Sequence, residues 1–264
     1  MNDFHTRPLP IVSKPNQAEG DVDIQVYRRF FANKATHGIM VDVGAARPNY
    51  LSVSASFRER GWRIIAIEPN PEFCEMHKAL GHEIYPYACT DHDEDDAQFS
   101  LVDSNDSSYE GGKVSFESFS SIAIKDAYAM LNPDIKSRTI LVSLRKLDTI
   151  LAKHAEDVAE IDVVSIDVEG WEMEVLQGFD IEKYKPKVLI VENLFNDPVY
   201  VESFASKGYR RWSRNLINDI YVRHGFHGTG ASRYYMPLIE YCELFAERIR
   251  HRLRRSIRDH GRSI

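Results

Sequence analysis

The residues best placed for chemistry are the carboxylates of Asp167 and Glu169, which follow the short apolar segment Val163–Ile166. Gly170 lets the chain turn there, and we expect a helix to follow. A buried parallel strand that ends in carboxylates just before a helix is a usual place for chemistry in open α/β sheets. Either carboxylate could take a proton from a hydroxyl as a general base. The alternative is an acidic turn at the sheet edge that only contacts water.

Glu192 and Asn193 follow the apolar segment Val188–Val191, so neighbouring strands would bring them close to Asp167. Hard oxygen ligands of this kind suit Mg²⁺ completed by water molecules. We therefore take Asp167, Glu169 and Glu192 as candidate catalytic residues, and Asp167, Glu192 and Asn193 as candidate magnesium ligands. A metal-free site with Asp167 or Glu169 as the base, and carboxylates with a structural role only, remain alternatives.

A second group of candidates begins at the predicted strand Gly38–Val43, which contains Asp42 and runs into Gly44. Glycine lets a backbone approach a ligand closely, and Glu68, at the end of the next strand, suits hydrogen bonding to ribose hydroxyls. The turn has one glycine and Pro48 donates no amide, so it fits a dinucleotide pyrophosphate poorly. We therefore predict S-adenosyl-L-methionine as the cofactor. A strand-exit glycine and a solvated Glu68 without a ligand are the alternative.

The predicted cofactor-binding residues lie at the ends of the first three predicted strands. They are Asp42, Gly44, Ala45, Glu68, Pro69, Asn70 and Cys89. Asp42 would lie near the ammonium or sulfonium end of the cofactor.

Apolar periodicity predicts that strands and helices alternate, as in a doubly wound α/β fold. The predicted strands are 38–43, 62–67, 83–88, 140–144, 163–166 and 188–191. The predicted helices are 23–32, 51–60, 71 to about 80, 148–153 and one after Gly170. The segments 209–212 and 217–222 are predicted to form a closing antiparallel pair. We therefore expect a Rossmann-like sheet, mostly parallel, with an antiparallel closing strand.

The chain divides into a loose N-terminal arm over residues 1–22, a main domain over 23–230 and a basic C-terminal helix over 231–264. Residues 91–139 interrupt the alternation, and the acidic and Ser-rich stretch 91–122 is either a lid over the site or a surface excursion. Of the remaining candidates, His224 and His227 follow the last strand in a Gly-rich loop and are interpreted as solvated bystanders. Trp171 is interpreted as core packing and not as a platform for an acceptor.

Composition limits the choice of partner and compartment. No apolar run approaches the roughly 20 residues that cross a bilayer, no signal peptide is recognisable, and three cysteines without metal-type spacing suit a reducing cytoplasm. Residues 247–264 hold seven arginines against Glu247 and Asp259, so the rest of the chain is more acidic than the net charge of −7 indicates. An acidic body makes general nucleic-acid binding unfavourable. The basic helix packs on its own domain or a second subunit, or lies on an anionic membrane.

Four segments resemble, in the same order, the FkbM-type methyltransferases: Val41–Ala45, Ile67–Pro71, Leu147–Asp148 and Ile166–Gly178. The resemblance covers residues 24–223, and its most specific part is Asp-Val-Glu-Gly-x-Glu followed by Glu-Val-Leu-x-Gly. It implies a class I methyltransferase fold and O-methylation that depends on S-adenosylmethionine, often of sugars or secondary metabolites. One departure is Ala46-Arg47-Pro48, where the family usually has Asn and a second Gly.

The carboxylate after one strand and the Glu-Asn pair after the next also resemble the metal site of catechol O-methyltransferase-type enzymes. We therefore predict an O-methyltransferase that acts on a hydroxyl of a sugar, glycolipid or natural product. The alternatives are an RNA methyltransferase, with the Arg-rich tail on the nucleic-acid backbone, and a non-catalytic binding module of the same fold.

Overall fold

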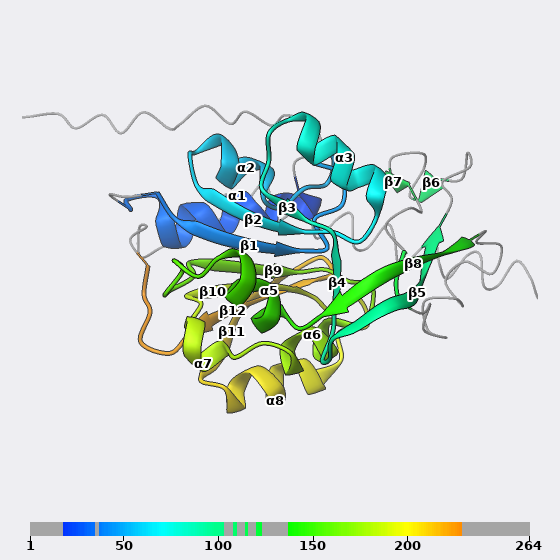
Figure 1. Cartoon of the computed structure of the whole chain (residues 1–264). Coiled ribbons are helices and arrows are strands. Elements are labelled where there is room, and N and C mark those ends of the chain that lie inside the picture. The colour runs from blue at the N-terminus through cyan, green and yellow to red at the C-terminus, as the bar shows by residue number, and fades with distance from the viewer. Residues whose placement is uncertain are drawn as a thin grey trace, which may run out of the picture.

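The computed structural model describes residues 18–34, 37–102, 108–109, 114–115, 120–122 and 137–228. Its main sheet is built from β1 (Ile39–Val43), β2 (Arg63–Ile67), β3 (Ile84–Tyr85), β9 (Val163–Ile166), β10 (Val188–Glu192), β11 (Tyr209–Asn215) and β12 (Asn218–Arg223). The strand order is β11-β12-β10-β9-β1-β2-β3 (Figure 1). Strands β3, β2, β1, β9 and β10 are parallel, while β12 runs antiparallel to β10 and to β11. The predicted sheet with an antiparallel closing strand is confirmed.

The centre of this sheet is apolar because it is covered on both faces. Every residue of β9 and β10 is buried, as expected for parallel strands between two helical layers. Val41 of β1 pairs with Ile65 of β2 on one side and with Val164 of β9 on the other. The carboxyl ends of β1, β2, β9 and β10 therefore lie along one edge of the sheet.

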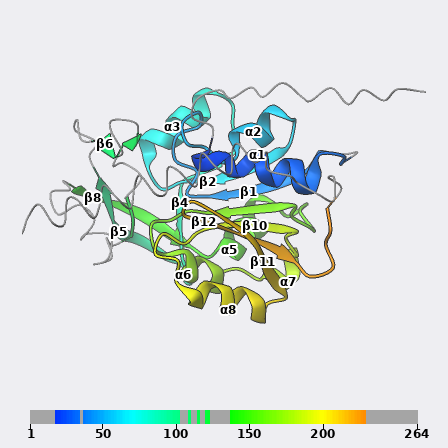
Figure 2. The same cartoon turned by 180° about the vertical axis from the view of Figure 1, so that it is seen from behind.

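Helices cover the two faces of the sheet (Figures 1 and 2). One layer contains η1 (Glu19–Asp21), α1 (Val22–Val26), the π-helical turn η2 (Tyr27–Phe31), α2 (Ala55–Glu59) and α3 (Pro71–Ala79). The other contains α5 (Leu147–His154), α6 (Glu172–Gln177), α7 (Ile181–Tyr184) and α8 (Pro198–Ser206). None of the described helices is long and apolar enough to cross a membrane.

Each face of the sheet has its own apolar core because successive residues of a strand point to opposite faces. Val41 and Val43 pack with the α5–α8 layer, in the same cluster as Leu151 and Phe204. Met40 packs on the other face with Phe30 of η2 and the aromatic residues around it.

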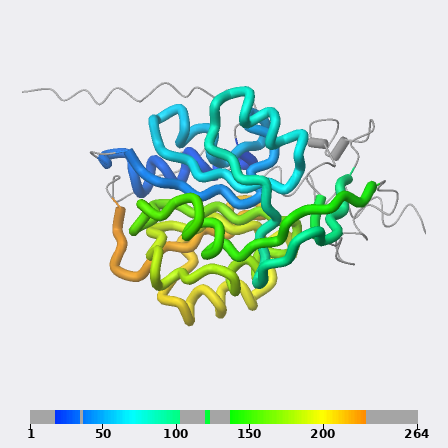
Figure 3. The backbone as a smooth tube through the Cα atoms, viewed as in Figure 1, coloured from blue at the N-terminus to red at the C-terminus, as the bar shows by residue number. Residues whose placement is uncertain are grey.

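A smaller sheet lies beside the main one (Figure 3). Its strands are β4 (Tyr87–Cys89), β5 (Glu94–Val102) and β8 (Ser137–Arg145), in the order β4-β8-β5. β4 and β8 are parallel, and β5 and β8 are antiparallel. Phe99, Leu101 and Leu144 form part of its own buried core. The short strands β6 (Ser108–Tyr109) and β7 (Val114–Ser115) pair with each other.

The smaller sheet corrects two predictions. The strand predicted over 83–88 is two strands, β3 in the main sheet and β4 in the smaller one, with Pro86 between them. The strand predicted over 140–144 is part of β8, so it does not extend the parallel sheet.

Several boundaries also differ from the prediction. Helix α2 is shorter than the predicted 51–60, since Leu51 has a left-handed φ of +52° that an α-helix does not allow. Helices α7 and α8 were not predicted, and β5 lies in the stretch predicted as irregular. Helical structure begins at Glu19, inside the predicted arm 1–22, of which residues 1–17 lie outside the described residues. The predicted basic helix 231–264 also lies outside them.

Candidate active site

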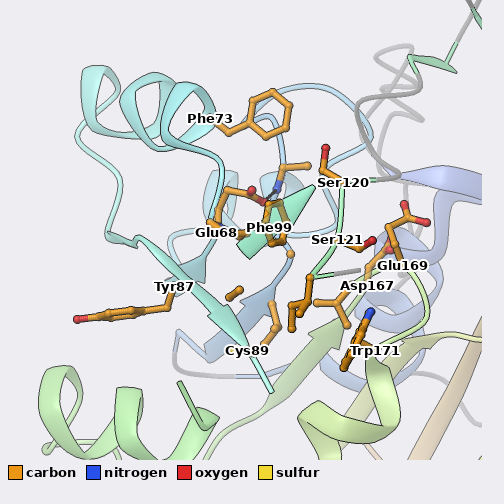
Figure 4. Close-up of a pocket in the computed structure, with 17 residues that line it drawn as sticks. Glu68, Phe73, Tyr87, Cys89, Phe99, Ser120, Ser121, Asp167, Glu169 and Trp171 are labelled. Atoms are coloured by element: carbon orange, nitrogen blue, oxygen red, sulfur yellow. Dashed lines mark hydrogen bonds between the residues drawn. The ribbon is translucent and has the colours of Figure 1, made fainter. Parts of the chain in front are cut away.

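The ends of β1, β2 and β9 enclose one pocket, which has a volume of about 650 Å³ including its open mouth (Figure 4). This size is in the range of small-molecule sites. The end of β1 and the turns after β1, β2 and β9 contribute to its lining Val43, Gly44, Ala46, Glu68, Pro69, Asp167, Val168, Glu169 and Trp171, and helix α3 contributes Phe73. Tyr87, Ala88, Cys89, Phe99, Ser120, Ser121 and Ile122 complete the lining. Predicted residues from both the cofactor group and the catalytic group therefore meet in one cavity.

Gly44 lies against the Asp167 turn, so the two halves of this edge meet at this residue. Its φ is +80°, and a Cβ built on it would lie 1.8 Å from the carbonyl oxygen of Asp167. Its amide donates to the carbonyl of Ile67, at 3.0 Å. Any side chain here would push β1 away from the Asp167 turn, so glycine is required by both conformation and space.

Glu68 is buried at the end of β2 and its carboxylate faces the pocket (Figure 4). Oε2 accepts the amide of Ala46 at 2.9 Å, and Oε1 accepts the amide of Asn70 at 2.8 Å. Burial raises the pKa of Glu68 to about 7, although the two backbone hydrogen bonds favour the ionised form. The side chain is therefore fixed in place and still has lone pairs for a ligand.

Asp167 and Glu169 bring two carboxylates to the pocket through one tight turn. Glu169 has a φ of +57° and Gly170 a φ of +94°, so the turn reverses the chain before α6. Burial, with the nearby carboxylates of Glu172 and Glu19, raises the pKa of Asp167 to about 8. Burial and the charge of Asp167 also raise the pKa of Glu169 well above its usual value. Such shifts suit groups that exchange protons near neutral pH.

Glu172, a residue that the sequence interpretation did not single out, holds this turn. Its Oε1 accepts the amides of Val168 at 3.1 Å and of Gly170 at 3.0 Å. Its Oε2 accepts the hydroxyl of Tyr200 of α8 at 2.8 Å. The available sequence signal was that Glu172 is the last residue of the Asp-Val-Glu-Gly-x-Glu motif.

The smaller sheet forms a wall of the pocket that was not predicted residue by residue. Phe99 comes from β5, and Ser121 is tied to Ser100 of β5 by two backbone hydrogen bonds of 2.8 and 3.0 Å. The side chain of Ser120 accepts the amide of Val102 at 2.9 Å. Of the two interpretations of stretch 91–122, these contacts favour the lid, because part of the stretch encloses the pocket.

Trp171 and Tyr87 both line the pocket but differ in orientation. Trp171 is half-buried beside Asp167 and Glu169, so its interpretation as core packing is wrong. The Tyr87 side chain extends away from the other labelled residues in Figure 4, and its hydroxyl lies 3.2 Å from Nε2 of His154.

Three predicted cofactor residues are not among those that line the pocket. Asp42 is buried on the α2 side of β1, where Ser54 hydrogen-bonds to it; burial raises its pKa. Ala45 packs in the aromatic core. Asn70 caps α3, since its side chain accepts the amide of Glu72 at 2.9 Å. The pocket is lined by the other four predicted cofactor residues, which are Gly44, Glu68, Pro69 and Cys89.

The predicted magnesium set is not brought together at the pocket. Asp167 lines it, whereas Glu192 and Asn193 do not. The Asn193 amide donates to the Asp219 carboxylate at 2.9 Å, and its oxygen accepts the Asp197 amide at 2.8 Å. Within the described residues, no group of three or more His, Cys, Asp or Glu side chains could hold a metal ion. The arrangement thus gives the magnesium alternative no support.

His224 and His227 are exposed and do not line the pocket, in agreement with their interpretation as bystanders.

Comparison with known proteins indicates the family of the chain. Residues 42–226 match the family described as "Methyltransferase FkbM domain", which covers both the Gly44 turn and the Asp167 turn. A comparison with curated proteins found no match. The strand order and the antiparallel closing strand are those of a Rossmann-like methyltransferase fold. The chain therefore belongs to the FkbM methyltransferase family.

Proposed function

We propose that the protein is an O-methyltransferase that uses S-adenosylmethionine and acts on a hydroxyl of a sugar, glycolipid or natural product. The observation that supports this best is the shared pocket of Glu68, Asp167 and Glu169. A cofactor-binding carboxylate and two candidate bases line the same cavity at the carboxyl end of a parallel sheet.

The residues of the cofactor half fit this ligand. Glu68 has free lone pairs directed at the pocket and would accept ribose hydroxyls, while the bare backbone of Gly44 allows close approach. Pro69, Phe73 and Cys89 provide an apolar wall that suits an adenine ring. When bound, S-adenosylmethionine supplies an electrophilic methyl group.

The residues of the other half fit the acceptor. Asp167 would take the proton of the acceptor hydroxyl, since its raised pKa makes the carboxylate a stronger base than an exposed aspartate. Glu169 lies beside it and would orient a neighbouring hydroxyl. Trp171 forms the adjacent wall and limits the access of water. This is the metal-free alternative, which needs neither Glu192 nor Asn193.

The alternative of an RNA acceptor receives less support. Outside residues 247–264 the chain has a clear excess of acidic over basic residues, and such a body would repel a phosphate backbone.

The test combines binding and transfer. Calorimetry should show S-adenosylmethionine binding, and methyl-labelled cofactor should label members of a panel of sugars and lipid-linked glycans. Asp167→Asn should bind the cofactor within a few-fold of wild type but lower turnover about 10²-fold or more. Absence of cofactor binding, or labelling of RNA alone, would contradict the proposal. A chelator that abolishes turnover would restore the magnesium alternative.

A further inference from the structure

Ala46 adopts a conformation that its side chain disfavours. Its φ is +46°, in the left-handed region where a Cβ is costly and glycine or asparagine is preferred. The residue lines the pocket, and its amide is one of the two that fix Glu68. Something outside the turn must therefore stabilise this conformation.

A contact to Ala46 comes from His77 of α3, whose side chain is fully buried. Its Nε2 lies 3.1 Å from the carbonyl oxygen of Ala46. The peptide unit of Ala46 is thus held at both ends, by Glu68 at the amide and by His77 at the carbonyl.

The proton positions on the two histidines follow from this contact. A carbonyl oxygen only accepts, so Nε2 of His77 carries the proton. Nδ1 of the neutral ring is then an acceptor, and it lies 3.1 Å from Nδ1 of His82, which donates. The Ala46 carbonyl thus sets the His77 tautomer, and the donation from His82 stabilises the same tautomer.

We propose that His77 is a positioning residue of the cofactor pocket, which keeps Ala46 left-handed so that Glu68 keeps the orientation in which it binds ribose hydroxyls. His82 acts through His77 by fixing its tautomer. This inference rests on the proposed cofactor, and it assigns a role to two residues outside the pocket lining.

The surroundings keep His77 neutral, so it is a constant donor. Burial, more than any other cause, lowers the pKa of His77 to about 4, and Arg58 of α2 and His82 act in the same direction. Its hydrogen bond to Ala46 acts in the opposite direction and is outweighed. Near neutral pH the ring therefore carries one proton, at Nε2.

Calorimetric titration of S-adenosylmethionine at neutral pH tests the assignment with four variants. His77→Leu removes the donor and should weaken binding about 3- to 10-fold. His77→Gln can place an amide donor at the position of Nε2 and should recover part of this loss. Ala46→Gly alone gives the reference affinity for the double variant. In the His77→Leu background, Ala46→Gly should restore most of the lost affinity, because glycine adopts this φ without a donor.

Recovery of affinity in the double variant would show that His77 acts by positioning Ala46. A general loss of stability in His77→Leu would not be repaired by a glycine at position 46. His154→Leu is the control: it removes a partly buried histidine, which stacks on Tyr85 on the α5 side. It should leave the affinity unchanged.

Failure of the wild type to bind would overturn the proposed function and not this step alone. The positioning role would be overturned if the wild type binds S-adenosylmethionine and His77→Leu binds it with the same affinity. It would also be overturned if Ala46→Gly restores none of the affinity that His77→Leu loses. If His77→Leu does not fold, ¹⁵N spectra of the wild-type imidazoles decide, since an unprotonated Nε2 of His77 contradicts the proposal. His82→Leu, at a half-buried site, should shift that proton toward Nδ1 and weaken binding.

Discussion

Glu68 shapes the pocket and also offers it a carboxylate. Its two oxygens accept the amides of Ala46 and Asn70, which join the first turn to the start of α3. A change at Glu68 therefore removes a ligand contact and loosens both turns.

We expect Glu68→Ala to weaken S-adenosylmethionine binding by about 10- to 150-fold, the range for loss of a charge-assisted hydrogen bond of about 1.5–3 kcal/mol. Calorimetry measures the change. Glu75→Ala on the same helix is the control, because Glu75 is exposed and pairs only with Lys78 among the described residues. Equal affinities for Glu68→Ala and wild type would remove Glu68 from the cofactor site.

The raised pKa of Asp167 predicts a pH dependence for ligands that differ in charge. A sulfonium favours the ionised carboxylate, so binding lowers the Asp167 pKa from its free value of about 8. Affinity for S-adenosylmethionine, relative to the uncharged thioether S-adenosylhomocysteine, should thus rise on the order of 10-fold between pH 6 and 8 and then level off. Calorimetry with both ligands measures this ratio. Asp167→Asn should flatten it; a ratio that is already constant in the wild type would place the sulfonium elsewhere.

At the residue scale, the sequence predicted the pocket residues at strand ends but not those that depend on side-chain direction. Gly44, Glu68 and Asp167 were found because the turn after a parallel strand always faces the same edge. Asp42 does not line the pocket because strand residues alternate, and it shares the face of Met40, against α2. Asn193 does not line it either, and nothing in the local sequence indicates its contact with Asp219.

At the scale of elements, the sheet to which a strand belongs depends on long-range strand pairing, which the local sequence pattern does not show. Strands β3 and β4 follow each other with only Pro86 between them, and only the pairing of Tyr87–Cys89 with Ser143–Arg145 assigns the second strand to another sheet. In β5 the alternation of Ala97, Phe99 and Leu101 was a strand signal, but the acidic run before it resembled a turn. For this wall of the pocket, the sequence therefore left open whether the stretch is a lid or a surface excursion.

The close approach of Gly44, after β1, to the turn after β9 predicts that stability depends on this glycine. Gly44→Ala should lower the free energy of unfolding by more than about 3 kcal/mol, because the Cβ meets the Asp167 carbonyl and the φ is strained. Gly208→Ala is the matched control: its φ is +83°, but nothing lies within 4 Å of the added Cβ. It should cost only about 1–2 kcal/mol. Urea denaturation measures both. Similar losses in the two variants would mean that conformation alone requires Gly44.

At the scale of the whole molecule, the distribution of charge suggests a location for the enzyme. The body and the pocket are acidic, while seven arginines follow residue 247, outside the described residues. Basic residues near an anionic surface contribute about 1 kcal/mol each.

We therefore expect the full chain to co-sediment with anionic liposomes at low salt, and a chain truncated after Gly230 to remain in the supernatant. Added salt should release the full chain, because screening weakens the attraction. Neutral liposomes are the control. Identical sedimentation of both chains would rule out a membrane role for the tail and leave packing on the domain or on a second subunit.

The central position of β1 also affects how the chain folds while it is synthesised. Its second neighbour, β9, comes late: the amide of Ile39 donates to the carboxylate of Asp162, 123 positions further along. While the ribosome makes the residues between β1 and β9, the edge of β1 that later pairs with β9 has no partner. An unpaired apolar edge of this kind favours aggregation. The nascent chain is therefore open to aggregation until β9 emerges, and we expect fragments that end before residue 163 to be recovered mainly as aggregates.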